Sequence, residues 1–121
     1  MMKIFQTDYK INFVDDNNVF VGFDNEQYCC ENFGWFFSDK PENGDVEGIK
    51  PNLEGYNFDT EYFHSHWSEH FEEGGIVAFR LVNESNDELF LHLYNHHNGY
   101  YGHGFVFAIK PDIKIIRKDS L

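Results

Sequence analysis

The chain has 121 residues, a formal net charge of −12 and a hydrophobic content of 41%, and 19% of its residues are aromatic. Its length and hydrophobic content exclude a disordered segment and predict a single domain over residues 1–121 with its own core. No apolar run is long enough to span a membrane, and carboxylates in such surplus repel the phosphates of nucleic acid, which excludes a membrane span and disfavours direct nucleic-acid binding.

The net charge points to association as well as to solubility. A charge far from zero destabilises the compact state by self-repulsion, so a surplus of this size is typical of a protein that binds a basic partner. The first residues lack the apolar stretch and cleavage site of a signal peptide. The two cysteines, Cys29 and Cys30, are adjacent and do not form an ordinary long-loop disulfide. These features predict a cytoplasmic protein.

The N-terminal part has the pattern of a β-hairpin. Residues 9–14 alternate between polar and apolar side chains, residues 15–18 supply turn chemistry, and residues 19–23 form a second apolar run. Residues 28–37 are a longer apolar run whose periodicity is compatible with a strand or with a short helix.

The middle of the chain is acidic and rich in turn residues. Residues 41–79 hold nine acids and one base, a net charge of −8, and Pro41 and Pro51 with several glycines predict a long exposed loop over residues 38–57. Asp59 or Thr60 is a suitable N-cap for a helix that begins near Glu61 and ends at residues 74–75. A strand in this region is the alternative. The side chains expected on one face of the helix are Tyr62, Phe63, His66, Trp67, His70 and Phe71.

The C-terminal part predicts four more strands, over residues 76–82, 88–94, 105–109 and 113–116. The turns between strands are short, so neighbours are expected to be antiparallel. The predicted fold class is α+β and mainly β: a single antiparallel, meander-type sheet of about six strands, with one short helix and the long acidic loop.

The seven histidines invite a comparison with metal sites. His66 and His70 enclose Glu69, but a zincin needs Glu directly after the first His, and Trp67 occupies that place. Neither the cluster around residues 64–70 nor the one around residues 96–103 has a zinc-ligand spacing. We therefore expect solvated or core-edge histidines and no metal or other cofactor, with adventitious metal binding as the alternative.

No nucleophile stands out. Cys29 and Cys30, between Tyr28 and Phe33, are typical of small buried hydrophobic residues, and acidic neighbours disfavour a reactive thiolate. We therefore predict no catalytic residue and no enzyme activity.

The acidic segment has two interpretations, a solvated loop or a binding surface. Its carboxylates lie among aromatic residues, and acidic groups around aromatic anchors are what an inhibitor of a basic enzyme needs. Residues 98–102 likewise form either a hairpin turn whose tyrosines cover the core or a tyrosine-rich contact surface. The acids predicted to steer and pair with a partner are Asp39, Glu42, Asp45, Glu47, Glu54, Asp59 and Glu61. The predicted anchors are Trp35, Tyr56, Trp67 and Tyr101.

Two short strings carry a family likeness. The early one is Tyr28-Cys-Cys-Glu31, which follows residues 20–24 and precedes Trp35. The late one is Asn-Gly-Tyr-Tyr-Gly at residues 98–102. In these strings the chain resembles a group of small uncharacterised bacterial and phage proteins. The size, acidity and aromatic content also resemble the immunity proteins of contact-dependent growth-inhibition systems. Members of that class bind and neutralise the C-terminal toxin domain of a large secreted protein, often a nuclease. The resemblance implies a role and no residue assignments.

The sequence thus predicts an immunity protein that occludes the active site of a basic nuclease toxin domain, most simply a ribonuclease, because nuclease domains are basic where they bind phosphate. Two alternatives stay open. One is a metal-binding or small hydrolytic protein that uses the histidine clusters. The other is a phage-type acidic DNA mimic that inhibits a host enzyme.

Overall fold

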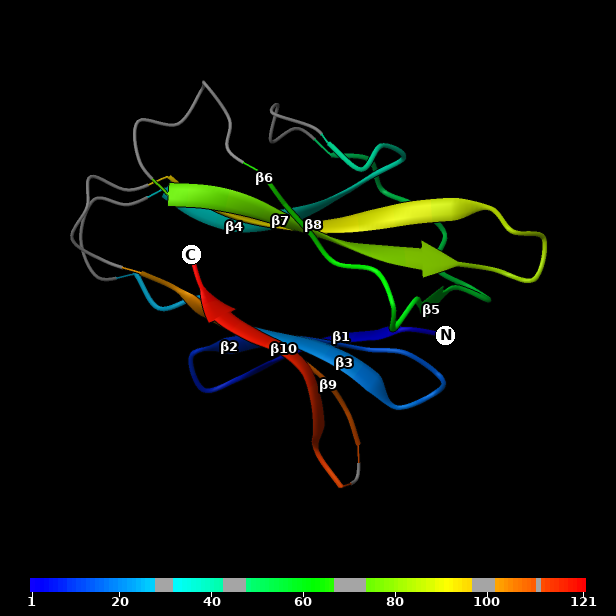
Figure 1. The fold of residues 1–121 in the computed structure, drawn as a ribbon, viewed down its shortest axis with the longest axis horizontal. Coiled ribbons are helices and arrows are strands. Elements are labelled where there is room, and N and C mark those ends of the chain that lie inside the picture. Colours follow the sequence, from blue (N-terminus) through cyan, green and yellow to red (C-terminus); the bar gives the residue numbers. More distant parts are fainter. Residues whose placement is uncertain (28–31, 43–47, 67–73, 97–101, 111) are drawn as a thin grey trace.

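The computed structural model describes residues 1–27, 32–42, 48–66, 74–96, 102–110 and 112–121, and these residues form ten strands and no helix. The strands make two antiparallel sheets that lie one over the other as layers (Figure 1). Sheet A has the order β1 (Lys3–Thr7), β2 (Lys10–Val14), β3 (Val19–Asp24), β9 (Gly104–Ile109) and β10 (Lys114–Ser120). Sheet B has the order β4 (Asn32–Ser38), β8 (Glu88–His96), β7 (Gly74–Val82) and β5 (Asn57–Phe58), and β6 (His64–His66) also pairs with β7.

The core lies between the two sheets because each sheet turns one apolar face inward. β2 alternates between buried and more exposed side chains, β3 turns Val19, Val21 and Phe23 to the core, and Phe13 and Phe23 are fully buried. Phe79 of sheet B meets Phe107 of sheet A edge to face, with ring centroids 5.0 Å apart. The aromatic content of the chain is thus used largely to join the two layers.

The outer face of sheet B is also buried, which the sequence analysis did not foresee. Phe36, Ile76 and Phe90 point away from the core and are nevertheless covered. His92 stacks on Phe36, and Tyr62 contacts Phe90. The segment after β4 returns to the free edge of this strand, where the N–H of Ile49 bonds to the carbonyl of Phe37 at 2.9 Å. A Cβ at Gly48 would lie 2.7 Å from the Cβ of Phe36, so only glycine allows this approach. Residues 39–42 and 48–50 of the predicted loop are exposed, as expected.

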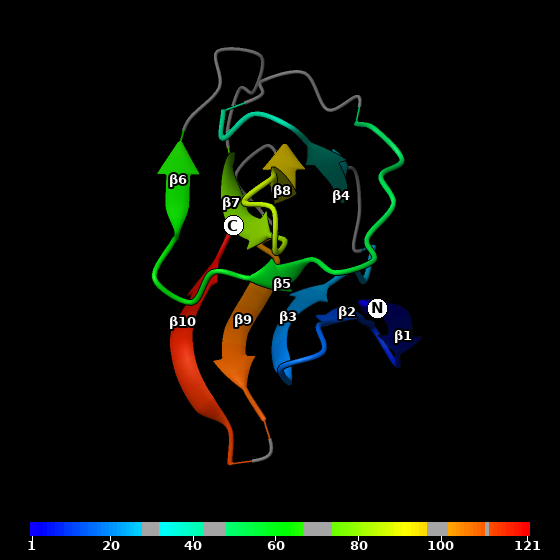
Figure 2. The ribbon, with the colours of Figure 1, turned by 90° about the vertical axis from the view of Figure 1, so that its right-hand side faces the viewer.

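One lateral side of the sandwich is closed by a contact between the layers. The guanidinium of Arg117 in β10 lies 4.6 Å from the ring centroid of Phe63, just before β6. Figure 2 shows β6 and β10 on the same side of the molecule. On the opposite side β1 and β4 are the edge strands.

The predicted single sheet is wrong. β3 pairs with β9 (Val19↔Ile109 to Phe23↔Phe105), whereas β4 pairs with β8, so the two runs belong to different layers. Apolar faces of two sheets bury more area against each other than one sheet with a single short helix allows.

The predicted helix after Asp59 is also wrong in the described residues. Consecutive side chains there point to opposite sides, because Tyr62 contacts Phe90 on the outer face while Phe63 stacks with Phe105 in the core. That alternation belongs to a strand, and β6 follows directly. Residues 74–75 open β7 and do not end a helix. Residues 67–73 lie outside the described part of the chain.

The remaining strands agree with the sequence. The first hairpin, β7, β8, β9 and β10 all lie where the sequence predicted strands, with ends shifted by at most four residues, and the pairing is antiparallel throughout. The run at residues 28–37, open between strand and helix, contains β4. β1 and β5 were not predicted, and β6 lies in the region where a strand was the alternative to the helix. In the residues that the structure describes, no helix is long and apolar enough to cross a membrane.

Candidate functional site

The negative charge is concentrated on one layer. The described residues of sheet B and its connections, 32–42, 48–66 and 74–96, carry eight acids and three bases, a net charge of −5. The rest of the described chain, which forms sheet A, carries seven acids and six bases, a net charge of −1. The molecule therefore has an acidic layer and a nearly neutral one, and a basic partner is attracted to the first.

An ion-pair network lies where β7 and β8 meet the β5–β6 connection. Arg80 reaches Asp59 at 2.8 Å and Glu88 at 2.5 Å, and these two hydrogen bonds raise the pKa of its guanidinium. Asp59 also accepts the N–H of Glu61 at 3.0 Å. Asp59 was predicted to bind a partner, but its carboxylate is already engaged in shaping this connection.

Two further side chains extend the network. Glu42 pairs with the Nε2 of His64 at 2.8 Å. Burial raises the pKa of the Tyr62 phenol, and the negative charges of Glu42 and Glu88 raise it further. Carboxylates from two separate segments, Glu42 and Glu88, thus act on Tyr62. We call this group the acidic patch: Glu42, Asp59, Tyr62, His64, Arg80 and Glu88.

The predicted anchors do not share one surface. Trp35 points toward the core, with its ring 5.0 Å from that of Phe13 and 5.9 Å from that of Phe37, yet it lies on the edge strand β4 and is 38% exposed. Tyr56 is partly buried against the core. Trp67 and Tyr101 lie outside the described residues. Of the four, Trp35 is the one that the described structure leaves accessible to a partner.

A second accessible apolar side chain, that of Ile49, was not predicted from the sequence. Ile49 is 49% exposed and forms a bridge to Phe37 beside β4. Its signal was available, since it is an isolated aliphatic residue between Gly48 and Lys50 in a segment otherwise rich in acids and turn residues.

The predicted acids divide into three groups. Asp39, Glu42, Glu54 and Glu61 are exposed, and Glu42 belongs to the acidic patch. Asp59 is half-buried and paired with Arg80. Asp45 and Glu47 lie outside the described residues. The exposed acids therefore remain suited to steering a partner.

A serine and a histidine meet on the outer face of sheet B. The Oγ of Ser38 lies 2.6 Å from the Nε2 of His92, and both groups reach the carbonyl of Lys40, at 2.8 and 3.1 Å. A carbonyl only accepts hydrogen bonds, so Nε2 carries the proton. An imidazole in this tautomer does not accept the serine proton through Nε2, which general-base activation of the serine requires. The pair therefore fixes the segment after β4.

Two histidines, His92 and His103, are fully buried and pack against aromatic rings. His92 stacks on Phe36 at 4.5 Å, and His103 stacks on Phe33 at 3.9 Å and donates from Nδ1 to the carbonyl of Asp24 at 2.7 Å. Both are fully buried, deeper than the solvated or core-edge positions expected. In the part of the chain with described coordinates, no three His, Cys, Asp or Glu residues are grouped as metal ligands. Cys29, Cys30, His70 and His97 lie outside that part.

Comparison with known proteins adds one match. The model of a family described as a domain of unknown function (DUF7448) matches residues 1–107, which include every strand of sheet B and all of sheet A up to the middle of β9. No curated protein and no solved structure matches the chain.

Proposed function

The chain belongs to the DUF7448 family, whose description assigns no activity, and for this member we propose the role of a cytoplasmic immunity protein that binds and neutralises a basic nuclease toxin domain. The observation that supports the proposal is the charge of the sheet B layer, a net −5 on its described residues against −1 on the rest of the described chain. A nuclease domain is basic where it holds phosphate, so carboxylates on this layer are able to occupy the positions of the phosphates.

The arrangement of exposed groups supports binding at this layer. Asp39, Glu54 and Glu61 are exposed on the connections that join β4 to β6. Charges of this kind accelerate association, whereas apolar side chains that become buried at the centre of an interface slow dissociation. Trp35 and Ile49, both beside β4, are the apolar contacts in this proposal.

The experiment uses the purified full chain as bait at low salt, in a lysate of its source organism. The proposal expects capture of a basic toxin domain, its release by salt, and loss of its RNA-cleaving activity when bound. Capture of a host polymerase or repair nuclease in its place would contradict the immunity role and favour the DNA mimic.

A charge-reversal series tests the surface with the captured partner. The triple variant Asp39→Lys, Glu54→Lys, Glu61→Lys should lower the association rate about tenfold and flatten its salt dependence. The matched control, Asp16→Lys, Asp112→Lys, Asp119→Lys, makes the same change of charge on the sheet A side and should leave the rate within about twofold. Equal effects of the two triples would exclude specific steering by the sheet B layer.

A further inference from the structure

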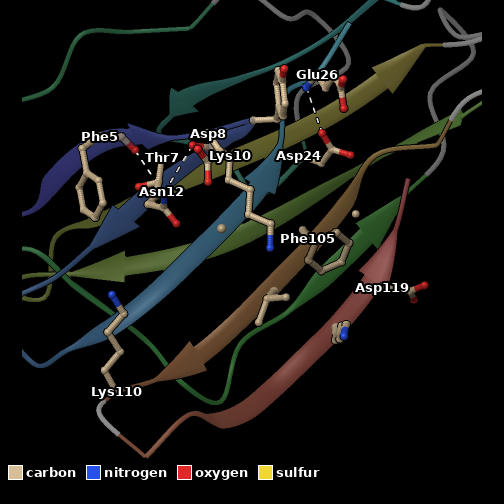
Figure 3. A pocket seen from close by; sticks show the side chains of 15 residues that line it. Phe5, Thr7, Asp8, Lys10, Asn12, Asp24, Glu26, Phe105, Lys110 and Asp119 are labelled. Carbon is tan, nitrogen blue, oxygen red and sulfur yellow. Dashed lines mark hydrogen bonds between the residues drawn. The ribbon is translucent and has the colours of Figure 1, made fainter. Parts of the chain in front are cut away.

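A groove crosses the outer face of sheet A, on the layer opposite the acidic patch (Figure 3). Its volume is about 670 Å³, within the range of small-molecule sites. Residues from all five strands of sheet A line it, and their side chains alternate with the core-facing ones such as Phe13 and Phe23. The groove is therefore built on paired strands, which position its side chains better than loops do.

Gly22 leaves space at the centre of the groove because it has no side chain. Cross-strand partners form a row from Phe5 through Asn12, Gly22 and Val106 to Lys118. Gly22 stands at the centre of this row, and glycine inside a strand often marks a place where a ligand approaches the backbone. The row is aromatic at its β1 end and cationic at its β10 end.

Three ammonium groups border the groove. Lys10 extends over β3 toward the middle of the groove, and Lys110 lies at its lower end (Figure 3). Lys118 stands beside Val106. Among the described residues no carboxylate forms an ion pair with any of these three lysines, although the chain contains 21 acids. Lys110 lies over the ring of Phe20, with its Nζ 5.0 Å from the ring centroid, so the ammonium groups of Lys10 and Lys118 are the two left to receive an anion in the groove.

Carboxylates also border the groove. Asp8 and Glu26 lie near the β1–β2 turn, and the Asp24 carboxylate accepts the N–H of Glu26 at 3.0 Å. Lys10 begins at this same end, as the cross-strand partner of Asp24, and its side chain extends toward the middle of the groove (Figure 3). Asp119 lines the groove on the β10 side and lies 3.7 Å from Arg117. Acceptors at the β1 end are suited to the amino or ring N–H groups of a ligand whose anionic part lies between Lys10 and Lys118.

We infer that this groove binds a nucleotide, with its ring against Phe5 and Asn12 and its phosphates near Lys10 and Lys118. Phe5 is 41% exposed and offers a flat face for stacking. The Nδ2 of Asn12 donates to the Oγ1 of Thr7 at 3.3 Å, while its Oδ1 lies beside Gly22 and is the kind of acceptor that pairs with the edge of a base. The occupant is either a free nucleotide or one unit of a single strand, which share this chemistry.

The acidic composition does not argue against this inference. The expectation that the chain avoids nucleic acid rests on residues 41–79, which belong to sheet B and its connections. The groove lies on the other layer, where acids and bases nearly balance. The inference is independent of the proposed immunity function, and each test leaves the other unaffected.

Titration of the full chain at low salt, followed by calorimetry and by amide chemical shifts, tests the inference. ATP and a single-stranded RNA of about six nucleotides are the probes, and inorganic phosphate is the control for the ring. Saturable binding with shifts at Gly22 and Val106 is expected. Tighter binding of ATP would identify a free nucleotide, and tighter binding of the RNA a single strand. No saturation up to about 1 mM, or equal binding of inorganic phosphate, would overturn the inference.

Two variants and one matched control complete the test. Lys10→Ala with Lys118→Ala should weaken binding at least about tenfold and reduce the salt slope by about 0.7 for each lysine removed. Gly22→Ala keeps every charge but raises the floor, since its Cβ would lie 3.3 Å from the Oδ1 of Asn12, and it should also weaken binding. Lys40→Ala with Lys50→Ala removes the same charge on the sheet B side and should leave binding unchanged. A loss of affinity common to both lysine pairs would mean that net charge alone is responsible.

Discussion

The carboxylate of Asp15, in the turn between β2 and β3, accepts a hydrogen bond of 2.8 Å from the backbone N–H of Phe58 in β5. The same carboxylate accepts the N–H groups of Asn17 and Val19, each at 2.9 Å. One buried side chain therefore closes a hairpin of sheet A and attaches it to a strand of sheet B. This link sets the position of the connection that carries Glu54 and Glu61.

Asp15→Ala should destabilise the fold strongly, because three backbone donors lose their acceptor and two of these bonds are buried. We expect a loss of about 3 kcal/mol in the free energy of unfolding, measured by urea denaturation. Asp16→Ala is the control, since that neighbour is exposed and pairs with the N-terminal amine, and it should cost less than about 1 kcal/mol. Similar losses in the two variants would contradict the role given to Asp15.

Gly34 gives a test of the packing on the outer face of sheet B. Its partner across the strands is Tyr94, whose ring lies over the glycine so closely that a Cβ would be 3.0 Å from the phenol oxygen and 3.2 Å from Cζ. Gly34→Ala should displace the ring and cost about 1–3 kcal/mol. The double variant Gly34→Ala, Tyr94→Leu relieves the clash. Thermal unfolding of the two variants should show partial recovery in the double one, and no recovery would exclude the ring as the cause.

Tyr94 also predicts a dependence of stability on pH. Burial raises the pKa of its phenol above the ordinary value of 10.0. The stabilisation by the neutral phenol is fully present below pH 10.0 and is lost as the pH rises through the pKa of the folded state, because the unfolded chain ionises first. Denaturation at a series of pH values should show this decline, and Tyr94→Phe should make it shallower. An identical decline in the variant would refute the assignment.

Arg117 and Phe63 predict the strength of the lateral contact between the layers. Arg117→Gln removes the cation from the ring of Phe63 and should cost about 0.5–1 kcal/mol, as for other exposed cation–π pairs. Lys114→Gln, also on β10, removes the same charge at an exposed position that has no ring contact among the described residues. Chemical denaturation of both variants, with a larger loss for Arg117→Gln, checks the prediction, and equal losses would assign the effect to net charge.

Much of the fold was predictable because it depends on local patterns. Alternation identified the strands of the first hairpin and those at residues 76–82, 88–94 and 105–109, and the short turns correctly indicated antiparallel neighbours. β5 and β6, with two and three residues, are too short to leave a periodic signal. β1 is exposed along its whole length, so it lacks a buried face that a pattern reveals.

The candidate sites were predictable only in part. The acidity of residues 41–79 predicted a binding surface. It did not reveal which of these acids are paired within the protein: Asp59 pairs with Arg80, which lies 21 positions later in the chain. The groove was not foreseen at all. Its lysines are scattered at positions 10, 110 and 118 and border one groove only because β3 pairs with β9.

By itself, the sequence determined that the chain folds, that it forms mainly antiparallel strands, and that its charge is distributed unevenly, because hydrophobic content, period-two alternation and charge are properties of the residues in order. Tertiary structure alone decided that the strands divide into two sheets, that the segment after β4 returns to the free edge of sheet B, and that the lysines of the groove lie on the layer opposite the acidic patch. The physical reason is that strand partners are chosen by burial between distant segments, and no local pattern contains that choice.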